Sequence, residues 1–181
     1  MPIKNYEKIL LQNNLYLILC KYTRMNALQR SLMPKRRILV VDDELFVREL
    51  LLEFFSKEGY EVCAEESGEK AVEKIKSEVF DVALIDLKMP GISGIETLKM
   101  IKAISPLTLN IIMTGYPTIE SCIDALRSGA YDYVVKPFKL SELKFCVDKA
   151  LEEHNLKDEI NKLRQKIKNL EDELKKYQNH T

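Results

Sequence analysis

The chain has 181 residues, of which 46% are hydrophobic and 31% are charged, a composition typical of one soluble domain with an appendage. Its 28 Lys and Arg residues balance 28 Asp and Glu residues, so the net charge favours neither a nucleic-acid partner nor a membrane surface. No apolar run reaches the roughly 18 residues of a membrane-spanning helix and no signal-peptide cleavage site is evident, so the cytoplasm is the expected location.

Residues 1–34 are expected to form an N-terminal extension, for which two interpretations stay open. The stretch around Ile9 to Leu19 has the spacing of an amphipathic helix. Alternatively, the segment lies upstream of a true translation start at Met33, because "MPKRRILVVDDE" leads directly into the first predicted strand.

Residues 35–153 alternate between strand-forming and helical runs, and the strand-forming ones are "RILVVDD", "YEVCAEE", "DVALIDL", "NIIMTG" and "YDYVVKP". Such alternation predicts a parallel five-stranded sheet with helices on both faces. The first and third runs are almost continuously apolar, which is typical of central strands. Gly59 and Gly129 stand where helices should stop, and Ser67 and Ser141 stand where helices should start.

Residues 154–181 have the pattern of a coiled-coil helix. Apolar residues recur at alternating spacings of four and three with polar residues between them, and this seam comprises Leu156, Ile160, Leu163, Ile167, Leu170, Leu174 and Tyr177. Ile at the a positions with Leu at most d positions favours two parallel strands. The pattern therefore predicts a parallel homodimer, and the alternative is a single solvated helix.

Three carboxylates follow two of the predicted strands, because Asp42 and Asp43 end the first strand and Asp86 ends the third. If these strands are neighbours, the carboxylates meet at the carboxyl edge of the sheet, where open parallel sheets bind ligands. Two carboxylates ~4 Å apart repel each other by on the order of 4 kcal/mol at an effective dielectric constant of 20. Oxygen ligands without His or Cys select Mg²⁺ or Mn²⁺, so a divalent-cation site is predicted.

Complementary groups end the last two strands, since Thr114 supplies a hydroxyl and Lys136 an ammonium group. Around Asp86, these groups would form a pocket for a phosphoryl group with the carboxylate as nucleophile. The turn at Met89–Gly91 can leave the carbonyl of Lys88 facing the metal ion.

Four motifs, "ILVVDDE", "DLKMPGISG", "MTG" and "YDYVVKPF", make residues 35–153 similar to the receiver domain of two-component response regulators. The resemblance implies a doubly wound, flavodoxin-like α/β fold with the strand order 2-1-3-4-5. It also implies a regulator, not an enzyme, that accepts a phosphoryl group from a histidine kinase or phosphotransfer protein and signals through its surface or dimer state. Within this family, the segment from Met113 to Phe138 is most similar to receivers of NtrC-type transcription activators.

The resemblance assigns the acidic residues their roles. Asp86 is implied to be the phosphoacceptor. Asp43, Asp86 and the backbone carbonyl of Lys88 are implied to hold Mg²⁺, or Mn²⁺, and Asp42 to complete the acidic pocket.

The resemblance also gives roles to residues of the last two strands. Lys136 and Thr114 are implied to contact the phosphoryl group, and Thr114 and Tyr133 to form a switch pair. The Lys136–Pro137 peptide bond is implied to be cis.

Two other classes of protein stay open at this point. Haloacid-dehalogenase-like phosphatases also use an Asp and Mg²⁺ at strand ends, but they require Asp-x-Asp where this chain has Asp42-Asp43-Glu44. A flavin-binding flavodoxin-like module needs hydroxyls and glycines after the first strand, where two carboxylates would repel the phosphate.

The sequence contains no G-x-x-x-x-G-K-[ST] loop, so the ATPase of NtrC-type activators is expected to be missing, and direct nucleic-acid binding is not expected. The chain is then either a stand-alone regulator or a truncated receiver-linker piece of such an activator.

Overall fold

The structure is a computed structural model that describes the backbone of residues 35–178 and the side chains of residues 35–172. The expectations for residues 1–34, including the amphipathic helix and the start at Met33, therefore lie outside the described residues. Within the described part of the chain, no helix is both long enough and apolar enough to cross a membrane.

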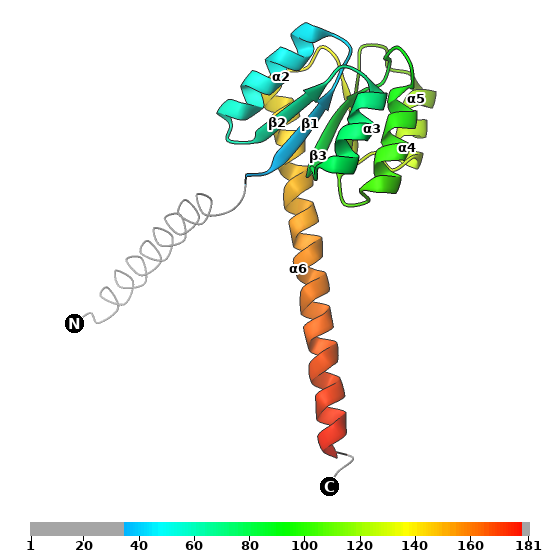
Figure 1. The fold of residues 1–181 in the computed structure, drawn as a ribbon. Helices are drawn as coiled ribbons and strands as arrows, with labels where there is room; N and C mark the ends of the chain where they lie inside the picture. The colour runs from blue at the N-terminus through cyan, green and yellow to red at the C-terminus, as the bar shows by residue number, and fades with distance from the viewer. Residues whose placement is uncertain (1–34, 179–181) are drawn as a thin grey trace, which may run out of the picture. The chain divides into compact units, whose positions relative to one another are not determined.

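A parallel sheet forms the centre of the fold, and its strands along the chain are β1 (Arg37–Val41), β2 (Glu61–Glu65), β3 (Val82–Asp86), β4 (Leu109–Thr114) and β5 (Asp132–Val135). The spatial order β2-β1-β3-β4-β5 confirms the doubly wound topology (Figure 1). All of β3, and β1 beyond its first residue, is buried, because helices cover both faces. β1 and β3 are also neighbours, so their carboxyl ends lie side by side.

Five helices in the described residues accompany the sheet, namely α2 (Leu45–Lys57), α3 (Gly68–Ser77), α4 (Gly94–Ile104), α5 (Ile119–Arg127) and α6 (Leu140–Gln178). Side chains of α2 and the first turns of α6 pack on one face of the sheet, and those of α3, α4 and α5 pack on the other. Alternate residues of each strand supply the two faces; Ile38 belongs to the first core and Leu39 to the second.

Three of the four predicted helix-boundary residues have the expected role. Gly59 and Gly129 follow helices with positive φ angles of 94° and 95°, and the Ser67 hydroxyl accepts a hydrogen bond from the backbone N–H of Lys70. The prediction for Ser141 was two residues late, since α6 begins at Leu140 and the position before the helix is therefore residue 139. The cause is the carbonyl of residue 139, which already accepts hydrogen bonds from the N–H groups of residues 142 and 143 and so closes the first turn.

Helix α6 presents two different faces along its length. Its first turns bury Leu143, Val147 and Ala150 in the core. Val147 and Leu156 are about two and a half turns apart, so the seam begins on the opposite face. The seam side chains with described positions are about half exposed, at 46–56% for Leu156, Ile160, Leu163, Ile167 and Leu170. Leu174 and Tyr177 also lie in α6, but their side chains are outside the described ones.

Candidate functional site

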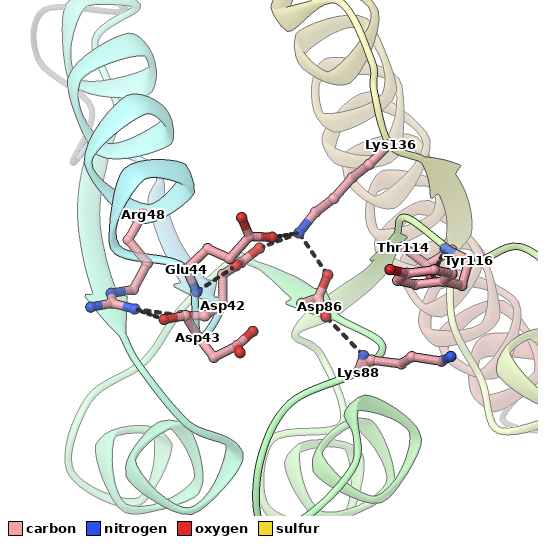
Figure 2. A network of polar contacts seen from close by, with 9 residues as sticks. All are labelled: Asp42, Asp43, Glu44, Arg48, Asp86, Lys88, Thr114, Tyr116 and Lys136. Atoms are coloured by element: carbon pink, nitrogen blue, oxygen red, sulfur yellow. Dashed lines mark hydrogen bonds and ion pairs between the residues drawn. The ribbon is translucent and has the colours of Figure 1, made fainter.

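Lys136 joins two carboxylates at the carboxyl edge of the sheet. Its Nζ atom lies 2.6 Å from Oδ2 of Asp42 and 2.6 Å from Oδ1 of Asp86 (Figure 2). Asp42 is fully buried and Asp86 is 6% exposed, so neither carboxylate has much water around it. The adjacency of β1 and β3 therefore brings the predicted acidic residues together, and the end of β5 supplies their cation.

Burial and ion pairing act against each other in this triad. Burial raises the pKa of Asp42, and the nearby Asp86 raises it further, while the hydrogen bond from Lys136 opposes both effects without cancelling them. Burial alone would lower the pKa of Lys136, but hydrogen bonds to Asp42 and Asp86 outweigh it and leave that pKa raised. The ammonium group is thus held charged beside Asp86.

Backbone geometry around the end of β3 fixes the second oxygen of Asp86. Oδ2 accepts a hydrogen bond of 2.8 Å from the backbone N–H of Lys88. The turn then passes through Gly91 at a φ of 82°, and α4 starts directly against the strand end. A Cβ at Gly94 would lie 2.1 Å from the carbonyl oxygen of Asp86, so only glycine permits this approach.

Thr114 and Tyr133 lie on the β4 and β5 side of the site. Thr114 is 1% exposed, and its hydroxyl accepts a hydrogen bond of 3.1 Å from the backbone N–H of Tyr116. The hydroxyl of Tyr133 is 2.8 Å from Oγ of Ser121 in α5. The Lys136–Pro137 peptide bond is cis. Because β3 lies between β1 and β4, Asp86 at the end of β3 lies between Asp42, which follows β1, and Thr114, which ends β4.

The donor groups at this edge suit a hard divalent cation. Asp42, Asp43 and Asp86 carry three negative charges when ionised, and Lys136 neutralises one of them, which leaves the charge that one Mg²⁺ ion balances. Asp43 is exposed at the rim. Among the described residues, no group of three or more His, Cys, Asp or Glu side chains forms a metal-binding set. The donor set implied for this site contains only two such side chains, together with one carbonyl.

Three residues near the site were not found from the sequence. Arg48 donates to the carbonyl oxygens of Asp42 and Asp43 at 2.7 and 2.9 Å and so holds the loop after β1. Glu44 approaches Lys136 at 3.9 Å, and Tyr116 lies beside Thr114. The sequence did contain a signal for Arg48, because this residue lies one turn into the helix that follows Asp42 and Asp43 and its side chain can therefore reach back to them.

Comparison with known proteins gives the family. Residues 38–148, more than half of the chain, match the family described as the response regulator receiver domain. The chain belongs to this family. The match favours the receiver over the phosphatase and flavin-binding alternatives, and receiver domains act in signalling. It also confirms the interpretation of the four sequence motifs.

Two relatives with different overall lengths are similar to this receiver. It is 40% identical over 131 residues to the regulatory protein AtoC of Escherichia coli. These aligned residues make up 72% of this chain and 28% of AtoC. It is 38% identical over 119 residues to sporulation initiation phosphotransferase F of Bacillus subtilis, covering 66% of this chain and 96% of that protein. The receiver thus spans about a quarter of AtoC but nearly all of the second relative.

Among solved structures, the response regulator TrrA of Thermotoga maritima, in complex with Mg²⁺ and BeF, is 42% identical to this receiver. The likeness has a TM-score of 0.59 and covers 64% of this chain and 99% of TrrA. The shared fold and motifs establish a response-regulator receiver.

Proposed function

We propose that residues 35–153 form a receiver unit that accepts a phosphoryl group on Asp86 from a sensor histidine kinase or a phosphotransfer protein. The observation that carries this proposal is the placement of the Asp86 carboxylate, at the edge of the sheet, between the Lys136 ammonium and the Lys88 N–H. A carboxylate used only for packing would not need to be held, nearly buried, at the end of a strand beside a second one.

The residues have distinct tasks in this transfer. An oxygen of Asp86 attacks phosphorus, and the bond from phosphorus to the donor breaks. The acyl phosphate adds about one negative charge and three acceptor oxygens, which Lys136 and the Thr114 hydroxyl would bind.

Asp43, Asp86 and the Lys88 carbonyl would hold Mg²⁺, or Mn²⁺. The ion would offset the negative charge that gathers on the phosphoryl oxygens. The structure of TrrA in complex with Mg²⁺ and BeF supports this expectation, because TrrA is a response regulator of similar sequence.

The chain would act as a switch and not as an enzyme that turns over a substrate. We expect it in the cytoplasm, with no direct nucleic-acid contact and no membrane partner. Residues 154–181 would form a coiled coil with a second copy, and phosphorylation would change either the receiver surface or the dimer. The exposed seam of α6 supports this second part of the proposal.

The test is labelling with a small radioactive phosphodonor and Mg²⁺. The protein should gain one acid-labile phosphate, and Asp86→Asn should gain none. Asp124→Asn is the matched control, because Asp124 is an exposed residue of α5. Full labelling of Asp86→Asn would overturn the assignment. Sustained hydrolysis of a generic phosphate ester would instead support the phosphatase alternative.

A further inference from the structure

The loop after β1 is held by a side chain that reaches back from the helix that follows it. Arg48 lies one turn into α2, and its Nη1 atom donates to the carbonyl oxygens of Asp42 and Asp43 at 2.7 and 2.9 Å (Figure 2). The Arg48 side chain is only 13% exposed, so water competes little for these charge-assisted hydrogen bonds. One guanidinium group therefore fixes two successive peptide units of the loop.

The stability of α2 does not account for this arrangement. The N-terminus of a helix carries a partial positive charge, so a cation near it is unfavourable. α2 has Glu44 as its N-cap, without a side-chain cap hydrogen bond, and no acidic residue in its first turn offsets the cation. The ion pair of Arg48 with Glu66 is long, at 3.9 Å, and Glu66 is 56% exposed, so this pair contributes little. The contacts of Arg48 thus serve the loop and not the helix.

The side chain of Asp43 depends on this loop for its direction. The carboxylate of Asp42 is held directly, by Lys136 at 2.6 Å and by the backbone N–H of Glu44 at 3.0 Å. By contrast, no hydrogen bond or ion pair reaches the Asp43 carboxylate from the other residues drawn in Figure 2. Its direction is therefore set by its own backbone, which Arg48 holds at the carbonyl oxygen.

We propose that Arg48 is a positioning residue for the divalent cation of this site. By holding the two carbonyl oxygens, it sets the direction of the Asp43 carboxylate and so raises the affinity for Mg²⁺ or Mn²⁺. This inference rests on the proposed function, in which Asp43 is a ligand of the ion. Direct electrostatics acts in the opposite direction, because a positive charge near the site repels a cation. The sign of the change on removal of Arg48 therefore separates positioning from charge.

Binding of Mn²⁺ alone to the unphosphorylated protein tests this proposal, since the electron paramagnetic resonance signal of free Mn²⁺ measures the Kd directly. Arg48→Met keeps an unbranched apolar side chain but removes both hydrogen bonds. Loss of a residue that orients a metal ligand lowers affinity by about ten-fold or more, so the Kd should rise by about ten-fold. Arg48→Lys keeps the charge and a donor on a shorter side chain, and its Kd should lie between the two.

Lys70→Met is the matched control for charge. Lys70 pairs with Glu66 at 2.7 Å and is 56% exposed, so this variant removes a cation without touching the loop after β1 and should not raise the Kd. Asp43→Asn is the reference for loss of the proposed ligand and should bind Mn²⁺ much more weakly. Urea titrations establish that each variant is folded under these conditions. In a second readout, the Mg²⁺ concentration for half-maximal labelling of Asp86 should rise in Arg48→Met by the same factor as the Kd.

The outcomes separate this inference from the proposed function. If Asp43→Asn binds Mn²⁺ like the unmodified protein, the proposed metal site fails and this inference fails with it. If Asp43→Asn binds more weakly but Arg48→Met binds as tightly as the unmodified protein, or more tightly, only the positioning role is refuted. An equal rise of the Kd in Lys70→Met and Arg48→Met would also refute it, since the carbonyl contacts would then not matter. If Arg48→Met does not fold, Arg48→Lys decides, and an unchanged Kd in that variant refutes the role.

Discussion

Lys136 is the residue on which the charge balance of the site depends. It contacts the carboxylates of Asp42 and Asp86 at 2.6 Å each, with its side chain only 16% exposed. Breaking a buried ion pair on one side leaves an uncompensated charge and costs more than the pair itself contributes. The site is therefore sensitive to loss of this single ammonium group.

We expect Lys136→Met to lower the free energy of unfolding by about 3–5 kcal/mol near pH 7, because two buried carboxylates lose their cation. The loss should be smaller near about pH 4, because burial raises the pKa of Asp42 and protonation of this carboxyl group removes one of the two negative charges. Urea titrations at both pH values measure this. Lys139→Met, at a side chain that is 81% exposed, should change little. Equal losses at both pH values would argue against an electrostatic cause.

Asp42 should destabilise the fold when it is ionised. Since burial raises its pKa, the folded state holds the proton more tightly than the unfolded state does. The favourable contribution of the protonated form is therefore complete below the unfolded pKa, and it is lost as the pH rises through the raised folded pKa. Neutral Asn avoids that loss.

Asp42→Asn is thus expected to raise the urea midpoint at neutral pH and to raise it less in acid. The comparison is with Asp124→Asn, which should leave the midpoint unchanged at every pH. A lower midpoint for Asp42→Asn at neutral pH would contradict the expected effect of burial.

Under the proposed function, the end of β4, the strand β5 and the helix α5 would respond to the phosphoryl group. Thr114 ends β4, and Tyr133 of β5 is anchored to Ser121 of α5 through a 2.8 Å contact between hydroxyl oxygens. Because the Thr114 hydroxyl only accepts its observed hydrogen bond, its own hydrogen is available to a phosphoryl oxygen. A shift of Thr114 toward Asp86 would open space for Tyr133 to move inward.

In Thr114→Ala, we expect labelling on Asp86 to persist. The response of α5 should weaken, because the variant lacks the hydroxyl that would move toward the phosphoryl group and bind it. Amide chemical shifts of α5 on addition of Mg²⁺ and beryllofluoride measure the response. Ser121→Ala removes the hydroxyl that contacts Tyr133. Before Mg²⁺ and beryllofluoride are added, the amide chemical shifts of this variant should already lie closer to those of the beryllofluoride-bound protein. Identical shifts in Thr114→Ala and the unmodified protein would rule out the hydroxyl as the link.

On the scale of the whole molecule, the two faces of α6 keep the receiver and the seam apart. The first turns of the helix are buried in the core, and the seam starts on the opposite face, exposed by about half. A second helix can therefore pack on the seam without displacing the sheet. In a parallel pair, Glu159 faces Arg164 and Lys166 faces Glu171, both attractive, although exposed pairs contribute only tenths of a kcal/mol each.

Light scattering at micromolar concentration should report a dimer of about twice 21.0 kDa. Leu163→Lys places a charge in the seam and should shift the protein toward monomer. Gln165→Lys adds the same charge at the outward f position of the same helical turn and should leave the dimer intact. Truncation after Glu153 should weaken or abolish the dimer. If the full-length protein is a monomer throughout the micromolar concentration range, the coiled coil is refuted.

By itself, the sequence determined the features that depend on spacing along the chain. The alternation of strands and helices, the heptad seam, and the strand-end positions of Asp42, Asp86, Thr114 and Lys136 are local or periodic, so they can be read without a fold. The strand order came from the resemblance, because the residues alone do not say which parallel strands are neighbours.

Only the tertiary structure decided which of these groups meet and how they are held. The length and direction of the Lys136 side chain let one ammonium group reach both Asp42 and Asp86. The sequence also did not predict the hydrogen bonds from Arg48 to the loop after β1, or the contact between Lys88 and Tyr116. Each depends on distances between loops far apart in the sequence, and no local propensity or period encodes such distances.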